Sequence, residues 1–149
     1  MRVPREYPTV LDLIGGTPLV RLQRLNRGLE PRILAKLDYM NPGGSVKDRI
    51  GIPMIQAAER AGKLRPGGTI VEPTSGNTGV GLAIAAALLG YRCVFVMPDK
   101  VSEEKRALLR AYGAEVVICP TSVPPVPTPA TNAVILPSVC RQISGPVVS

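Results

Sequence analysis

Short apolar strands that alternate with helical segments are the feature that most narrows the folds open to this sequence. The predicted strands are residues 33–37, 69–72, 93–97 and 115–119, and the predicted helices are residues 45–62, 77–89 and 102–112. Continuous apolar strands separated by helices at regular spacing are typical of a parallel sheet that is covered on both faces. We therefore predict an α/β fold of three layers, a parallel sheet with helices on both faces.

The first two predicted helices differ in how much of their surface is apolar. Residues 77–89 carry no charged side chain and are followed by Gly90, so this helix is expected to be buried and to end at the glycine. The first helix is amphipathic, with Ser45 as its expected N-cap. Its predicted apolar side consists of Ile50, Met54, Ala57, Ala58 and Ala61.

Charge is spread along the whole chain. The sequence has 18 Lys and Arg residues against 11 Asp and Glu residues, which gives a net charge of +7. An excess of this size is compatible with a nucleic-acid or small anionic partner. The basic residues form no run longer than two and are not interleaved with aromatic residues, which favours a solvated surface. We expect no nucleic-acid binding.

Histidine is absent, which removes Ser–His and Cys–His catalysis and most zinc sites from consideration. The three cysteines form no Cys-x-x-Cys pair, as fits a reducing compartment. The longest apolar run, residues 80–89, is far shorter than a bilayer crossing requires. We expect a soluble cytoplasmic protein with no metal site and no membrane attachment.

Residues 121–149 differ in composition from everything before them. They contain six prolines, one charged residue and no acidic residue, and they show neither helical nor strand periodicity. We therefore divide the chain into a folded unit, residues 1–120, and a Pro- and Val-rich tail, residues 121–149. The tail is expected to be disordered or to be the product of a frame shift.

Lys47 stands at the start of the first helix, after the tight turn of residues 41–46 (NPGGSV). A cation is unfavourable at that end of a helix, because the macrodipole places positive charge there. The same field, together with desolvation, favours the neutral amine, which is the form that attacks an aldehyde. An ordinary solvated lysine is the alternative interpretation of this residue taken alone.

A second turn lies between a predicted buried strand and a predicted buried helix. It contains Thr74, Ser75, Gly76, Asn77 and Thr78. Its hydroxyl groups, its backbone N–H groups and the helix dipole converge where a carboxylate or phosphate can bind, and Gly76 permits close approach of the backbone. The alternative is a capping turn that uses Ser75 or Thr78 and has no ligand.

Taken together, three segments resemble the fold-type II pyridoxal-phosphate enzymes, which include cystathionine beta-synthase and cysteine synthase. They are residues 14–21 (IGGTPLVR), 41–49 (NPGGSVKDR) and 73–79 (PTSGNTG). The resemblance implies an incomplete fold like that of the tryptophan synthase beta subunit, with residues 1–120 as the N-terminal part of the catalytic domain. For the full-length family it also implies a homodimer.

The resemblance implies roles for the residues of both turns. Lys47 is implied to form the Schiff base with pyridoxal 5′-phosphate and to remove the α-proton of the substrate, while the cofactor ring takes up the electrons. Asn77 is implied to bind the cofactor as well. The residues implied to hold the substrate carboxylate are Thr74, Ser75, Gly76, Asn77 and Thr78.

Within the family, residues 90–105 look most like cystathionine beta-synthase. The implied reaction is β-replacement, in which serine loses its hydroxyl group and homocysteine adds to give cystathionine. Cysteine synthase, which combines O-acetylserine with sulfide, is the alternative. Family members also have a glycine-rich phosphate loop and a Ser or Thr that faces the pyridine nitrogen. Neither can be assigned in this sequence, so we expect the fragment to be inactive on its own.

Two other classes of function stay open. A nucleotide-binding module fits the α/β pattern, but the step Gly62-Lys63 is followed by Leu64, and Ala57 stands where a P-loop needs glycine. A non-catalytic interaction fragment fits an incomplete sheet, whose open edge and apolar face would bind a partner chain. Absorbance of a bound cofactor distinguishes an enzyme from such a fragment.

Overall fold

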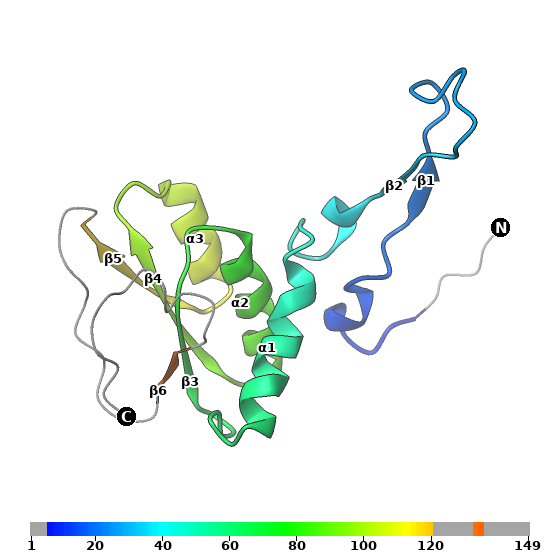
Figure 1. Cartoon of the computed structure of the whole chain (residues 1–149). Coiled ribbons are helices and arrows are strands. Elements are labelled where there is room, and N and C mark those ends of the chain that lie inside the picture. The colour runs from blue at the N-terminus through cyan, green and yellow to red at the C-terminus, as the bar shows by residue number, and fades with distance from the viewer. Residues whose placement is uncertain (1–5, 121–132, 136–149) are drawn as a thin grey trace.

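The computed structural model describes residues 6–120 and 133–135. Figure 1 shows a parallel sheet with helices beside it and an arm formed by the N-terminal residues. The strands are β1 (Leu19–Arg21), β2 (Leu34–Lys36), β3 (Thr69–Pro73), β4 (Arg92–Pro98), β5 (Glu115–Cys119) and β6 (Ala133–Ile135). The helices are α1 (Asp48–Arg60), α2 (Asn77–Leu89) and α3 (Glu103–Ala111), with the short 3-10 helices η1 (Val10–Leu13) and η2 (Asp38–Met40).

The main sheet has the strand order β5-β4-β3-β6, and every neighbouring pair in it is parallel. Val71 of β3 lies opposite Val94 of β4, which in turn lies opposite Glu115 of β5. The strands predicted at residues 69–72, 93–97 and 115–119 are confirmed. The α/β class, a parallel sheet flanked by helices, is confirmed with them.

The strand predicted at residues 33–37 also forms, as β2, but it lies outside the parallel sheet. It pairs antiparallel with β1, so that Ala35 lies opposite Val20, and Figure 1 shows this pair extending away from the main sheet beyond α1. Leu34 is 52% exposed, whereas strands of a covered parallel sheet are buried on both faces. The apolar composition indicated a strand and did not specify its partner.

Within the described residues, α1, α2 and α3 lie to one side of the main sheet (Figure 1). Strands β3, β4 and β5 follow one another across the sheet in chain order. Right-handed crossovers between strands added in one direction place their helices on the same face. The helices predicted for the other face are not among the described residues. The core includes Ile70, Leu82 and Phe95, each 0% exposed.

Helices α1 and α2 cross at two glycines. A Cβ added to Gly51 would lie 2.4 Å from the backbone oxygen of Gly81, so the two backbones are in contact. The buried residues of α1 are Asp48, Gly51, Ile55 and Ala58. The predicted apolar side was therefore wrong in part, because a glycine contact does not register as apolar periodicity. Of its members, Ala58 is buried and Met54 packs half-buried against the core, whereas Ile50 is half-buried and Ala57 and Ala61 are exposed.

The predicted buried helix at residues 77–89 is confirmed as α2. All residues from 79 to 86 are buried, because the helix packs between α1 and the sheet. Gly90 ends it with a φ of 77°, a left-handed conformation that glycine adopts without steric cost.

Most of the predicted tail, residues 121–149, lies outside the described residues. The exception is β6, which is three residues long and pairs in parallel with β3, so that Ala133 lies opposite Thr69. No strand periodicity is visible there in the sequence, and β6 was accordingly not predicted.

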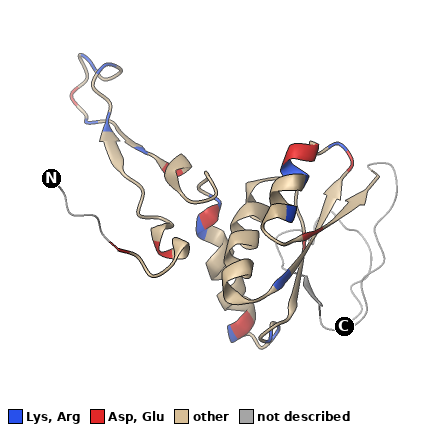
Figure 2. Cartoon of the chain, turned by 180° about the vertical axis from the view of Figure 1, so that it is seen from behind, with Lys and Arg blue, Asp and Glu red and all other residues tan. Residues whose placement is uncertain are grey.

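Charged residues of both signs are mixed in the described structure. In Figure 2, Lys and Arg lie close to Asp and Glu on α1, on α3 and in the loop between β1 and β2. Among the helices that the structure describes, none combines the length and the apolar character that a membrane crossing requires.

Candidate active site

Lys47 is the N-cap residue of α1. The helix begins at Asp48 rather than at Ser45. The prediction that Ser45 is its N-cap was therefore wrong. The Ser45 hydroxyl instead accepts a hydrogen bond from the N–H of Lys47 at 3.2 Å, and its backbone oxygen accepts from the N–H of Asp48 at 3.2 Å, so Ser45 closes the turn that leads into the helix. The Lys47 side chain is exposed, so the desolvation expected at this residue is not provided by the described part of the chain.

Asn41 holds the turn that precedes Lys47. Its side-chain amide donates to the backbone oxygens of Asp38 at 2.7 Å and Ser45 at 3.1 Å. Its Oδ1 accepts from the N–H of Gly15 at 2.8 Å. Asn41 is only 4% exposed, and a buried amide with its donors and acceptor in use fixes the backbone around it.

Arg49, two residues after Lys47, joins the same region from α1. Its Nη2 donates to Asp38 Oδ1 at 2.7 Å, to the Gly15 oxygen at 3.2 Å and to Thr17 Oγ1 at 3.4 Å. The Arg49 guanidinium and then the Thr17 hydroxyl lower the pKa of Asp38 below its ordinary value. These bonds tie the segment around Gly15 to residues 41–47, which we call the lysine turn.

Asp38→Asn is expected to destabilise the chain at neutral pH and to have a smaller effect in acid. The pKa of Asp38 is lowered from its ordinary value of 3.8 in the folded chain. Its contribution is therefore present in full above 3.8 and is lost as the pH falls through the folded pKa. Urea unfolding of both proteins at neutral pH and at several lower pH values measures this difference. A difference that does not change with pH would contradict the role of the charge.

The second turn leads from β3 into α2, whose N-cap residue is Gly76. No side chain caps α2, so the alternative in which Ser75 or Thr78 serves as its cap is wrong. The N–H of Gly79 donates to the Gly76 oxygen at 3.1 Å, which leaves the N–H groups of Asn77 and Thr78 in an uncapped first turn. Together with the helix dipole, such groups attract an anion.

The outer side of this turn is open. A Cβ added to Gly76 would meet nothing within 4 Å. Ser75 and Asn77 are exposed, whereas Thr74 and Thr78 are half-buried. A ligand can therefore approach the turn from the side of Ser75, Gly76 and Asn77.

The lysine turn packs against α2 where α1 crosses that helix. A Cβ added to Gly81, which lies one helical turn after Asn77, would be 3.0 Å from the backbone oxygen of Lys47 and 3.0 Å from the Cα of Asp48. The backbone of Lys47 thus packs against the beginning of α2. The structure thus places the backbone of Lys47 one helical turn from Asn77 along α2, and the binding roles of the residues in both turns stay predictions.

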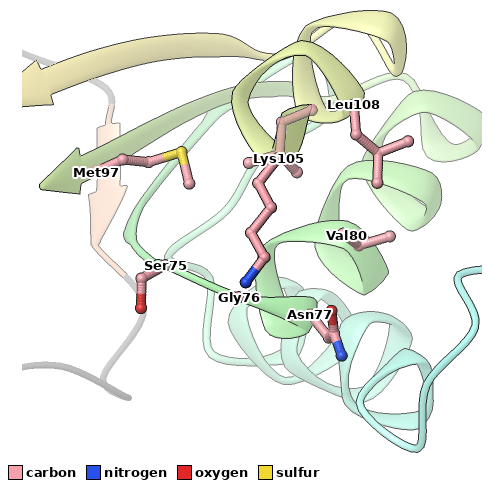
Figure 3. A pocket seen from close by; sticks show the side chains of 8 residues that line it. Ser75, Gly76, Asn77, Val80, Met97, Lys105 and Leu108 are labelled. Carbon is pink, nitrogen blue, oxygen red and sulfur yellow. The ribbon is translucent and has the colours of Figure 1, made fainter. Parts of the chain in front are cut away.

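A pocket opens beside the second turn, on the side of α3 (Figure 3). Its cavity volume is about 30 Å³, and counting the open space at its mouth gives about 270 Å³. It is lined by Ser75, Gly76, Asn77, Val80, Met97, Lys105, Leu108 and Leu109. The predicted site residues that do not line it are Lys47, Thr74 and Thr78.

Lys105 is a pocket residue that the sequence did not single out. Figure 3 shows its side chain running from α3 toward Gly76 and Asn77. A cation beside an uncapped helix N-terminus adds to the attraction for an anion. Ligands of parallel α/β sheets lie at the carboxyl ends of the strands. Because α3 follows the carboxyl end of β4, this rule would have pointed to Lys105.

Comparison with protein families matches residues 10–147 to the family described as pyridoxal-phosphate dependent enzyme. Cystathionine beta-synthase of Rattus norvegicus is 59% identical over 121 residues, which are 80% of this chain and 22% of that protein. Cysteine synthase of Staphylococcus aureus is 56% identical over 113 residues, which are 76% of this chain and 36% of that protein.

Two solved structures share the fold. One is a hydrogen sulfide-producing enzyme from Fusobacterium nucleatum, with a TM-score of 0.74 and 42% identity over 80% of this chain and 39% of that one. The other is O-ureido-L-serine synthase, with a TM-score of 0.69 and 49% identity over 78% of this chain and 36% of that one. This chain therefore spans well under half the length of the relatives that it matches.

The family match covers all three segments that carry the resemblance, residues 14–21, 41–49 and 73–79, and it extends beyond residue 120. High identity and similar folds accompany it. The chain therefore belongs to the fold-type II pyridoxal-phosphate dependent enzymes, in the family of cystathionine beta-synthase and cysteine synthase.

Proposed function

We propose that this chain supplies the lysine and the substrate-carboxylate side of a site for pyridoxal-phosphate-dependent β-replacement on an amino acid. The observation that carries the proposal is the contact of the Lys47 backbone with the beginning of α2, at Gly81. This contact sets a residue with a primary amine next to an uncapped helix N-terminus. An amino-acid substrate has a carboxylate that suits such a terminus and an α-proton that suits such a base.

The donor groups fit pyridoxal 5′-phosphate. Its aldehyde requires a primary amine, which Lys47 provides, and its ring hydroxyl requires a hydrogen-bond donor, which the exposed amide of Asn77 provides. The open space at Gly76 leaves the backbone of the second turn accessible. We assign Lys47 and Asn77 to the cofactor, and we assign no described residue to its phosphate.

When bound, the cofactor supplies an electron sink for bonds broken at the α-carbon of the substrate. The residues of the chain bind the substrate and remove its α-proton. The hydroxyls of Thr74, Ser75 and Thr78, with the N–H groups of the first turn of α2, bind the α-carboxylate and so orient the Cα–H bond. The Nζ atom of Lys47 takes the α-proton.

For the substrates we propose serine and homocysteine, which give cystathionine and water. The resemblance of residues 90–105 to cystathionine beta-synthase supports this pair, as does the 59% identity to a protein of that name. O-acetylserine and sulfide form the alternative pair, supported by 56% identity to a cysteine synthase.

The assay that decides joins residues 1–120 in turn to the remaining catalytic part of the rat and the S. aureus relatives. A preference shared by both fusions belongs to this chain, and we expect it to be cystathionine formation. Faster formation of cysteine in both would favour the alternative pair. Fusions without cofactor absorbance would contradict the proposed function and favour an interaction fragment. The 149-residue chain alone is expected to fall far below an ordinary turnover of about 10 per second.

Asn77→Ala is expected to lower kcat/KM of these fusions about tenfold or more, because a hydrogen bond to a charged group contributes about 1.5–3 kcal/mol. Thr9→Ala is the control. The Thr9 hydroxyl caps η1 by accepting from the N–H of Leu11 at 3.2 Å, far along the chain from α2. Equal kcat/KM values in the two variants would show that Asn77 has no part in the site.

A further inference from the structure

Asp48, the residue after Lys47, has a fully buried carboxyl group. Its side chain is 0% exposed, and its Oδ2 accepts a hydrogen bond from the N–H of Gly43 in the lysine turn. No group in the described part of the chain bonds to its Oδ1. Burial raises the pKa of Asp48, although hydrogen bonds from the backbone N–H groups of Gly43 and of Asp48 itself act in the opposite direction.

The carboxyl group fills the space where the lysine turn, α1 and α2 meet. A Cβ added to Gly43 would lie 2.6 Å and 2.9 Å from the two carboxyl oxygens of Asp48 and 2.9 Å from Cγ1 of Val80. On the other side, a Cβ added to Gly81 would lie 3.0 Å from the Cα of Asp48. The side chain is therefore enclosed between the turn and α2.

The helix dipole alone does not account for this arrangement. An acidic residue in the first turn of a helix is favourable when it is exposed, and it then keeps its hydration. A buried carboxyl group with one oxygen left without a geometric hydrogen-bond partner is costly. The buried position gives Asp48 a hydrogen bond from the N–H of Gly43, which joins the two ends of the turn that carries Lys47.

We propose that Asp48 is a positioning residue for Lys47. By accepting the N–H of Gly43 from a site enclosed against α2, it holds the turn of residues 41–47 in one arrangement and so fixes where the Lys47 side chain starts. The proposal rests on the proposed function insofar as Lys47 is the amine that condenses with the cofactor aldehyde. Asp48 itself touches neither cofactor nor substrate in this proposal.

Two measurements on the whole 149-residue chain test it. The first is amide hydrogen exchange of residues 41–47, which needs no cofactor. The second is the ratio of Lys47 to Lys63 labelling by pyridoxal 5′-phosphate and borohydride, read by peptide mapping. Lys63 is an exposed lysine beyond the far end of α1, and it reports the reactivity of an unpositioned amine.

Asp48→Ala is expected to speed exchange in residues 41–47 about tenfold and to lower the labelling ratio about fivefold or more. Asp48→Asn keeps an acceptor for the Gly43 N–H and is expected to retain most of both signals. Gly43→Ala, which pushes on the same contact, is expected to behave like Asp48→Ala. Leu64→Ala is the control for a general loss of stability: Leu64 is a core residue that is 4% exposed, and its truncation should leave the ratio unchanged.

Two results would overturn the proposal. The first is that Asp48→Ala shows the same amide exchange and the same labelling ratio as the natural chain. The second is that Asp48→Asn loses as much exchange protection and labelling ratio as Asp48→Ala. If Asp48→Ala does not fold, the comparison of Asp48→Asn with Gly43→Ala decides in the same way. A natural chain that shows no preference for Lys47 would count against the proposed function instead. The exchange of residues 41–47 would then still test the role of Asp48.

Discussion

Borohydride reduction of the chain with pyridoxal 5′-phosphate is expected to label Lys47 in preference to the other lysines. Lys47 is exposed and begins α1, next to the N-terminal end of α2. The amine of Lys36, by contrast, donates to the backbone oxygens of Gly15 and Thr17. Lys105 is the most informative competitor, because it reaches the same turn from α3 (Figure 3).

Lys47→Arg is expected to lower the amount of pyridoxal 5′-phosphate attached to the chain after reduction by more than about tenfold. Arginine keeps the charge but has no amine that condenses with an aldehyde. Peptide mapping after reduction gives the label at each lysine. Lys63→Arg is the matched control and should leave the label on Lys47 unchanged. A main label on Lys36 or Lys63 in the natural chain would remove the basis for Lys47 as the cofactor lysine.

Gly51→Ala is expected to lower the free energy of unfolding by about 2 kcal/mol, although alanine favours a helix over glycine by about 1 kcal/mol. The added Cβ would lie 2.4 Å from the oxygen and 2.7 Å from the carbonyl carbon of Gly81. Because both are backbone atoms, they cannot turn aside as a side chain would, and α1 has to move away from α2. Urea or thermal unfolding measures the loss.

Gly16→Ala is the control for adding the same methyl group. The Cβ there would lie 3.8 Å from the Leu13 oxygen, an ordinary contact, so we expect a change within about 0.5 kcal/mol. Since the crossing also holds the backbone of Lys47, Gly51→Ala is further expected to reduce the labelling of Lys47. Stability equal to that of the natural chain would mean that the helices do not touch at Gly51.

Local sequence was sufficient to predict α2, because a helix buried on all sides is apolar on all sides. It was also sufficient for the parallel strands, whose apolar runs stand between helices at regular spacing. It failed where the outcome depends on contacts between distant segments. Nothing in residues 33–37 indicates that β2 pairs with β1. Likewise, the buried face of α1 follows from Gly51, whose role is to be small rather than apolar.

The candidate site was predictable to a similar extent. The motifs singled out Lys47 and residues 74–78; residues 74–76 lead directly into α2, and the backbone of Lys47 packs against Gly81 of the same helix. Their binding roles stay predictions. The burial of Asp48 was not predictable, because an acidic residue in the first turn of a helix is expected to be exposed, where the dipole favours it and it keeps its hydration. Lys105 was missed because it enters the pocket from α3, a separate strand–helix unit.

The distance between the anchor of Lys47 and the start of α2 is set by backbone atoms. The oxygen of Lys47 and the Cα of Asp48 face the Cα of Gly81 with no side chain between them. Rotation of side chains therefore cannot widen or narrow this spacing, and the only soft coordinate left to the amine is its own flexible stem. A motion that separates the backbone of Lys47 from the beginning of α2 must therefore bend one of the two helices or move α1 and α2 apart.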